Sequence, residues 1–344
     1  MRLINFFKYI KYLNKNTISY KYLKNRFLCA YSYYRGKPVT AGFPTKLHIE
    51  LTNICNLNCI MCPRSYMKRE RGMMEFATFK KIIDESRGKL EFAYLHLFGE
   101  SLLHPCLFKM IKYCKDAGIS AGLATNATIL DKIKSQRIID SGLDFLVISF
   151  DGTSKQTYEM IRRGGNFEQT LDNITTFLHI RKTRPRPHTV IQMIYMKDTD
   201  RVEEYIQFWN SYNVDGIRVK PLQTWSGEIE SINALSPSSN EKKLTKPCDR
   251  LWRHICILWD GTVVPCEFDF DKIYPLGNVK SETLSEIWNG ERIINLRKMH
   301  LSGKKSDIDL CKSCTYSAPS TLENIAMVAL DTLMATKIIS DLNK

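Results

Sequence analysis

The chain has 344 residues, of which 44% are hydrophobic and 25% are charged, and its formal net charge is +14. This length exceeds that of one ordinary domain and suffices for a barrel-sized core with an accessory module. No run of 18 apolar residues occurs, so we expect no transmembrane helix. The basic charge is concentrated in residues 1–49, which hold ten Lys and Arg and no carboxylate, whereas the rest carries 40 basic and 36 acidic side chains. This distribution argues against a nucleic-acid partner, which would require basic side chains along the body.

Residues 1–43 are predicted to form a basic, amphipathic N-terminal extension. Its first residues place apolar side chains at helical spacing with lysines between them: Leu3, Phe6, Phe7, Ile10 and Leu13. Two interpretations stay open. The segment 1–38 can lie on an anionic membrane surface, or it can pack on the body and expose its lysines. A transit peptide fits less well, because the segment is rich in Lys and not in Arg and Ser.

Residues 44–235 alternate short apolar strands with amphipathic helices. Strands are predicted at 47–51, 94–98, 120–124, 145–150, 189–196 and 216–221, and helices at 77–87, 105–117, 131–141, 168–182 and 202–212. Strict alternation predicts a parallel sheet with right-handed crossovers, so the fold class is α/β. Six such units make a partial (β/α)6 TIM-like barrel, whose chemistry lies at the carboxyl ends of its strands.

The remainder of the chain is predicted to hold a small module and a terminal helix. Residues 223–247 are rich in Ser, Asn and Lys and are typical of a linker. Residues 236–315 contain the second group of cysteines and are assigned to a C-terminal cysteine-rich module. Residues 316–344 are expected to be helical, because Ser320 and Glu323 fit a capping box ahead of apolar residues at helical spacing.

The chain contains eleven cysteines, and their grouping indicates metal chemistry. Clustered cysteines in a large chain without a secretory h-region indicate a metal or catalytic site in a reducing cytoplasm. Cys55, Cys59 and Cys62 follow the first predicted strand with the spacing C-x3-C-x2-C. Three thiolates leave one iron of a four-iron cluster open to an external ligand. A zinc site completed by His48 is the alternative.

This cysteine motif after the first strand resembles that of the radical S-adenosylmethionine (SAM) superfamily. The resemblance implies a [4Fe-4S] cluster whose open iron is chelated by SAM. It further implies that electron transfer cleaves SAM to methionine and a 5′-deoxyadenosyl radical, which abstracts hydrogen from the substrate. Flavodoxin or ferredoxin is the expected electron donor.

Further landmarks of the family follow in order along the chain. Gly99 and Glu100 end the second strand like the family's Gly-Gly-Glu-Pro element, with Phe98 and Ser101 as departures. Thr125-Asn126 resembles its Thr-Asn-Gly element, with Ala127 in place of Gly. By the same resemblance, SAM contacts are expected from a further set of polar residues: Ser149, Arg162 and Gln192. The plainer interpretation is a surface position for Arg162 and packing in the core for Gln192.

The second cysteine group is spaced C-x17-C-x44-C-x2-C and consists of Cys248, Cys266, Cys311 and Cys314. With the surrounding Gly and Trp positions it resembles the SPASM/twitch modules of radical SAM enzymes, which house auxiliary [4Fe-4S] clusters. Four thiolates close a cluster and suit electron transfer or structure. Cys256 could replace Cys248 as a ligand, although an apolar neighbourhood favours a buried thiol. Zinc is the competing metal.

Together these features predict a radical SAM oxidoreductase that oxidises a small molecule and passes an electron to the auxiliary cluster. The alternatives are a maturase acting on a ribosomal peptide and a non-enzymatic iron–sulfur electron carrier or sensor. The enzyme is expected in the cytoplasm, with peripheral contact to the inner membrane surface left open. No catalytic base is assigned. Glu50, Arg218 and Lys220 lie at strand ends, but a solvated or salt-bridged role is the plainer expectation for each.

Overall fold

The structure is a computed structural model that describes residues 20–182, 184–197, 199–212, 214–227, 229–237, 246–314 and 316. The predicted amphipathic start of the chain and the predicted C-terminal helix therefore lie outside the described residues. None of the helices within the described ranges is long and apolar enough to cross a bilayer.

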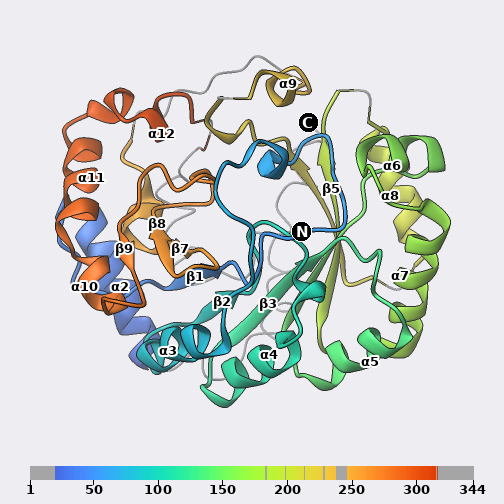
Figure 1. Cartoon of the computed structure of the whole chain (residues 1–344), viewed down its shortest axis with the longest axis horizontal. Coiled ribbons are helices and arrows are strands. Elements are labelled where there is room, and N and C mark those ends of the chain that lie inside the picture. Colours follow the sequence, from blue (N-terminus) through green and yellow to red (C-terminus); the bar gives the residue numbers. More distant parts are fainter. Residues whose placement is uncertain are drawn as a thin grey trace, which may run out of the picture.

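Six parallel strands alternate with helices and form the predicted partial barrel. The strands are β1 (Lys46–Ile49), β2 (Phe92–Tyr94), β3 (Ser120–Thr125), β4 (Phe145–Ser149), β5 (His188–Tyr195) and β6 (Gly216–Pro221). The helices are α3 (Phe76–Ser86), α4 (Leu107–Asp116), α5 (Lys132–Asp140), α6 (Lys155–Ile161), α7 (Phe167–Arg181) and α8 (Val202–Asn210). Figure 1 shows these helices along the outer rim of an arc whose strands lie inside it. The predicted α/β fold is confirmed.

The barrel is held by apolar side chains between the strands and the outer helices. Leu47, Ile49 and Leu123 are fully or almost fully buried, as is Phe79 on the inner face of α3. In β6, buried and less buried residues alternate, as expected of a strand with one face in the core and one toward the barrel interior. The interior can therefore carry polar side chains while the outer face supplies the hydrophobic core.

The C-terminal module continues the same sheet. Strand β7 (His254–Ile257) pairs with β1 in parallel, and β8 (Thr262–Val264) and β9 (Gly277–Asn278) follow in antiparallel pairing. The described strands thus form one nine-stranded sheet, in the order β6-β5-β4-β3-β2-β1-β7-β8-β9. Helices α10 (Leu284–Trp288), α11 (Glu291–Leu301) and α12 (Asp309–Lys312) complete the module. The sequence patterns did not indicate that the module extends the barrel from its first strand.

Two further segments bear on the predictions: the extension, for which packing on the body was one of the two open interpretations, and the linker, which differs from its prediction. Helix α2 (Tyr20–Tyr34) docks on the body through an ion pair between Arg26 and Glu91, both buried. The part of the predicted linker nearest the barrel folds instead into a 3-10 turn, Trp225–Gly227, and the short helix α9 (Glu230–Asn233). The Trp225 indole anchors this segment, because its N–H donates to the Met61 carbonyl at 3.0 Å.

Candidate active site

The loop after β1 brings the first three cysteines together. The Cys62 N–H donates to the Cys59 carbonyl at 3.1 Å, and the Leu57 N–H donates to the Cys55 sulfur at 3.4 Å. Burial raises the pKa of the Cys62 thiol to about 12, with smaller contributions from Cys59 and Cys55. These mutual effects place the three sulfurs in one neighbourhood. Three converging thiols are a donor set that suits a four-iron cluster with one open iron.

A buried ion pair, whose arginine the sequence did not indicate, lies at the base of this loop. Arg69 makes two hydrogen bonds to Glu50, at 2.8 and 2.5 Å, and its Nε donates to the Phe270 carbonyl at 2.6 Å. Glu50 is fully buried directly after β1 and also accepts from the Trp259 backbone N–H at 3.2 Å. Glu50 is therefore salt-bridged, which was one of the two plainer roles expected for it. The pair joins the cysteine loop to the C-terminal module.

The sequence placed Gly99 and Glu100 at the end of a strand over 94–98, but β2 ends at Tyr94, so both residues lie in the loop that follows it. Gly99 has a φ of +79°, and a Cβ there would lie 2.4 Å from the Thr52 carbonyl oxygen. The Glu100 carboxylate accepts from the Thr125 hydroxyl at 2.9 Å and from the Asn126 N–H at 2.8 Å. The chain leaves the sheet early because this loop must pack against the backbone just ahead of Cys55.

We expect Gly99→Ala to destabilise the protein by more than the roughly 1–3 kcal/mol that a left-handed backbone alone costs a non-glycine residue. The added methyl meets a backbone carbonyl that cannot move without shifting the cysteine loop. Gly88→Ala is the matched control, because Gly88 has a φ of +69° and no atom within 4 Å of the added carbon. Urea unfolding of both variants measures the difference. Equal losses would contradict the steric argument.

Asn126 connects the end of β3 with the cysteine loop. Its side-chain N–H donates to the side-chain Oδ1 of Asn56 at 3.1 Å, and the same nitrogen lies 3.7 Å from the Cys55 sulfur. Ala127 has a φ of +59°, which explains in physical terms why the family's pattern has Gly at this position. The departure at Ala127 therefore keeps the turn and costs some backbone strain.

Ser149, Gln192 and Arg218 form one row across three strands. Ser149 on β4 is in register with Gln192 on β5, and Gln192 is in register with Arg218 on β6. The Gln192 Oε1 atom is buried and has no hydrogen-bond partner within the part of the chain that the structure describes. An orphaned acceptor within β5, in register with a hydroxyl at the end of β4, fits a site that a polar cofactor completes.

Arg162 lies between a carboxylate and a candidate ligand. Its Nε donates to Asp151 Oδ2 at 2.6 Å, and its Nη1 lies 3.6 Å from the Cys59 sulfur. Asp151 is itself buried and accepts from the Ile194 N–H. The side chain is therefore buried beside the cysteine loop and does not take the surface position that was its plainer interpretation. Asp151 was not singled out in the sequence, although it follows Ser149 by two residues.

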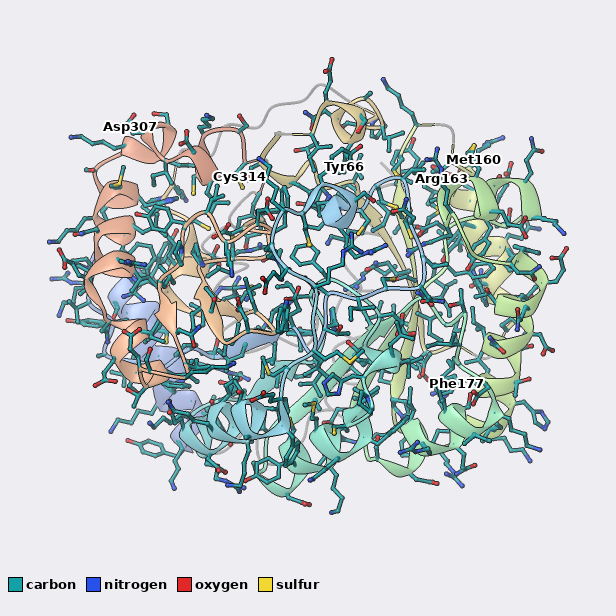
Figure 2. All side chains as sticks on the ribbon, in the orientation of Figure 1. Tyr66, Met160, Arg163, Phe177, Asp307 and Cys314 are labelled. Carbon is teal, nitrogen blue, oxygen red and sulfur yellow. The ribbon has the colours of Figure 1, made fainter. Side chains whose placement is uncertain are left out.

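The four cysteines of the second group line one cavity with largely apolar walls. Its other lining residues include Arg250, Phe268, Leu296, His300 and Tyr316. Cys256 does not line this cavity and is fully buried on β7. The structure thus brings the four predicted ligands together and leaves Cys256 as a buried thiol. Figure 2 shows Cys314 on the side of the molecule where α11 and α12 lie.

Family profiles match both regions of the chain. Residues 49–208 match the profile described as "Radical SAM superfamily", and residues 248–315 match SPASM, described as "Iron-sulfur cluster-binding domain". The chain belongs to the radical SAM superfamily. This radical SAM enzyme accordingly uses a [4Fe-4S] cluster and SAM, and its SPASM domain binds auxiliary iron–sulfur clusters.

Similar proteins cover most of this radical SAM enzyme. The tungsten-containing aldehyde ferredoxin oxidoreductase cofactor-modifying protein of Pyrococcus furiosus is 25% identical, over 78% of this chain and 88% of that protein. The S-adenosyl-L-methionine-dependent 2-deoxy-scyllo-inosamine dehydrogenase of Niallia circulans is 22% identical, over 80% of this chain and 95% of that protein. BtrN, solved with AdoMet and 2-DOIA, shares the fold with a TM-score of 0.58 at 18% identity, over 80% of this chain and 94% of that one. Streptococcus suis SuiB bound to precursor peptide SuiA shares the fold with a TM-score of 0.61 at 14% identity, over 80% of this chain and 71% of that one.

A line of polar side chains crosses the interior of the radical SAM barrel toward the second cysteine cavity. The His48 ring centroid lies 5.8 Å from that of His96 and 4.8 Å from that of His254. The His254 Nε2 lies 3.5 Å from Glu267, which pairs with Arg250 at 2.5 Å. The histidines looked scattered in the sequence, but the parallel register of β1 and β7 brings two of them to one face. His254, Cys256 and Glu267 also offer three ligand atoms within 4.8 Å of one another.

We expect the stability of the enzyme to fall as the pH drops below about 6.5, the pKa of histidine in an unfolded chain. Burial lowers the pKa of His48 and His254 and lowers that of His96 to about 3. The unfolded chain therefore takes up protons that the folded chain does not, which favours unfolding. At pH 5.5 the contribution of His96 alone is about 1.4 kcal/mol.

The measurement compares urea unfolding at pH 7.5 and 5.5 for wild type and His96→Gln. The variant should lose less stability on acidification than wild type. His179→Gln, on the exposed face of α7, is the control and should retain the wild-type difference. An unchanged difference in His96→Gln would show that this histidine is protonated in the folded protein.

Proposed function

We propose that the first cysteine group ligates the SAM-cleaving [4Fe-4S] cluster, that the second ligates one auxiliary [4Fe-4S] cluster, and that the enzyme oxidises a small molecule. The proposed ligands of the first are Cys55, Cys59 and Cys62, and those of the second are Cys248, Cys266, Cys311 and Cys314. When bound, the first cluster would supply the electron for reductive cleavage of SAM, and the second would accept the electron that the substrate radical loses together with a proton after hydrogen abstraction.

In this proposal, residues on and after strands β2, β4 and β5 bind and orient SAM. Gly99 lets the β2 loop approach the backbone ahead of Cys55. The Glu100 carboxylate fixes the end of β3 through two hydrogen bonds, from Thr125 and Asn126, and accepts a third from the Leu102 N–H of its own loop. Ser149 and Gln192 offer a hydroxyl and an unpartnered carbonyl oxygen to the cofactor. Arg162 is oriented by Asp151, which leaves its remaining N–H groups for a carboxylate beside Cys59.

The single observation that carries the oxidative reaction is the cavity with four thiols. Four cysteine ligands complete the coordination of a four-iron cluster, so such a cluster transfers electrons and does not chelate substrate. Zinc on the same thiols could only fold the module, because zinc has no redox chemistry. The relative from Niallia circulans is a dehydrogenase by name, and the chain covers 95% of it.

A peptide maturase is the second candidate. The PqqA peptide cyclase of Gluconobacter oxydans is 22% identical over 80% of this chain, and SuiB was solved with a precursor peptide. A peptide-binding winged helix ahead of the barrel would favour this candidate, but the described residues before β1 form one helix, α2. The electron carrier or sensor is disfavoured, because the chain belongs to a superfamily of SAM-cleaving enzymes.

The experiment that tests the proposal is SAM cleavage by anaerobically reconstituted protein. With dithionite, or with flavodoxin or ferredoxin as the physiological type of donor, the enzyme should release 5′-deoxyadenosine. Iron analysis should give about eight atoms per chain, four for each cluster. Purification that yields zinc, or a fully loaded protein that leaves SAM intact, would overturn the proposal.

Peripheral contact with the membrane is proposed in addition, on the evidence of α2. Its outward face exposes large apolar side chains at helical spacing: Tyr20, Leu23, Phe27, Tyr31 and Tyr34. Lysines flank this stripe, as expected of a helix on an anionic bilayer. Deleting the extension would remove the docked face as well, so the test is Phe27→Asp. Sedimentation with anionic liposomes should fall in this variant, and unchanged binding would contradict the proposal.

A further inference from the structure

We infer that Arg218 and Lys220 bind an oxyanion of the substrate, a carboxylate or a phosphate, inside the barrel. This inference rests on the proposed function and adds the chemical class of the substrate. Both side chains belong to β6, whose other face carries the buried residues Ile217 and Val219. Because side chains alternate along a strand, the two cations point to the barrel interior.

Neither cation has an ion pair with any residue in the described part of the chain. The Arg218 Nε atom is buried and has no hydrogen-bond partner there. Burial lowers the pKa of Arg218, and burial together with the Arg218 charge lowers the pKa of Lys220 to about 8. Removing a cation from water costs free energy that an opposite charge must offset. The site as it stands therefore lacks an anion.

The anions already in the barrel are held by other cations. Glu267 is the carboxylate that acts on Lys220, but it pairs with Arg250 at 2.5 Å and lies 3.5 Å from His254. The cysteine groups have cations of their own, since Arg162 lies beside Cys59 and the Arg250 charge interacts with Cys248 and Cys266. No cysteine is among the groups that act on Arg218 or Lys220.

Two more orphaned atoms lie around the same space. His96 is close enough to both cations for their charges to lower its pKa, and its Nδ1 atom is buried without a partner. Gln192, whose Oε1 is also unpartnered, is in register with Arg218. An oxyanion can accept two parallel hydrogen bonds from the Arg218 guanidinium, a third from Lys220 and a fourth from His96. This position puts a charged end of the substrate beside Ser149 and Gln192, which are proposed to contact SAM.

The test is calorimetric titration of the reconstituted, SAM-saturated holoenzyme with inorganic phosphate and, separately, with acetate at constant ionic strength. We expect binding to wild type and at least a tenfold loss of affinity in Arg218→Gln and in Lys220→Met. Arg218→Lys keeps the charge and should lose less than Arg218→Gln. Lys132→Met, an exposed cation on α5, is the control and should bind as wild type does. Tighter binding of phosphate would indicate a phosphate ester, and tighter binding of acetate a carboxylic acid.

The inference fails if wild type binds neither anion, or if both variants bind them as wild type does. It also fails if the variants lose affinity for SAM and not for phosphate, because the two cations would then belong to the SAM site. Release of 5′-deoxyadenosine by the same wild-type preparation keeps this failure separate from a failure of the proposed function. Iron content and circular dichroism of each variant verify that it folds and loads.

Discussion

Cys59→Ala lowers the iron content of the reconstituted protein by about four atoms per chain and abolishes the release of 5′-deoxyadenosine. This is the expected result because Cys55, Cys59 and Cys62 share one loop, whereas the four cysteines of the second group line a separate cavity. The same loss of cleavage is expected for Cys55→Ala and Cys62→Ala. Iron analysis, the electronic spectrum and chromatographic detection of 5′-deoxyadenosine measure the three effects.

Cys311→Ala should behave differently. Its sulfur belongs to the separate cavity with Cys248, so its loss removes a second group of about four iron atoms and leaves SAM cleavage measurable. Turnover of substrate should stop, because the electron left after hydrogen abstraction has no acceptor. Cys106→Ala is the matched control, since Cys106 lies in neither group and its removal should change neither iron content nor cleavage. Wild-type cleavage by Cys59→Ala would overturn the assignment of the loop.

The parts of the site that sequence could predict are those with local spacing. The three cysteines after β1 and the pair Cys311 and Cys314 stand within one loop or turn, where ligand spacing reflects geometry directly. The order of strands and helices was likewise readable from their periodicity, because each element is made from its own residues. The early end of β2 was not, because the position of Gly99 is set by packing against Thr52, 47 residues away in the chain.

The parts that sequence could not predict depend on strands that meet across long separations. The pairing of β1 with β7 brings His48 next to His254, and no local pattern marks that register. The two cations of β6 alternate visibly with apolar residues, yet alternation alone cannot tell a solvated face from a barrel interior. Only the arc of strands in the folded protein, with its interior carboxylate already paired to Arg250, shows that they lack a counter-charge within the described part of the chain.

Arg69→Met should destabilise the protein by about 3–5 kcal/mol, the cost of leaving a buried carboxylate without its partner. Glu50 is fully buried, and burial raises its pKa while Arg69 opposes that rise. The variant also loses the donor to the Phe270 carbonyl, so the cysteine loop is no longer tied to the C-terminal module. We therefore expect a lower iron content as well as a lower midpoint of urea unfolding.

Two controls separate the buried pair from a generic loss of charge. Lys112→Met breaks an exposed pair with Asp116, whose side chains are 72% and 55% exposed, and should cost at most about 1 kcal/mol. The double variant Glu50→Gln with Arg69→Met removes both charges and should recover part of the loss, because no uncompensated charge remains. A double variant less stable than Arg69→Met would contradict the desolvation argument.

The pH dependence of the Arg69→Met variant gives an independent check. Without Arg69, the pKa of Glu50 in the folded variant lies further above that of the unfolded chain. The folded state then binds the proton more tightly than the unfolded state, so protonation stabilises the variant as the pH falls. The deficit relative to wild type should therefore be smaller at pH 5 than at pH 7.5. A deficit that stays constant with pH would show that the lost stability comes from packing and the Phe270 contact, and not from the buried charge of Glu50.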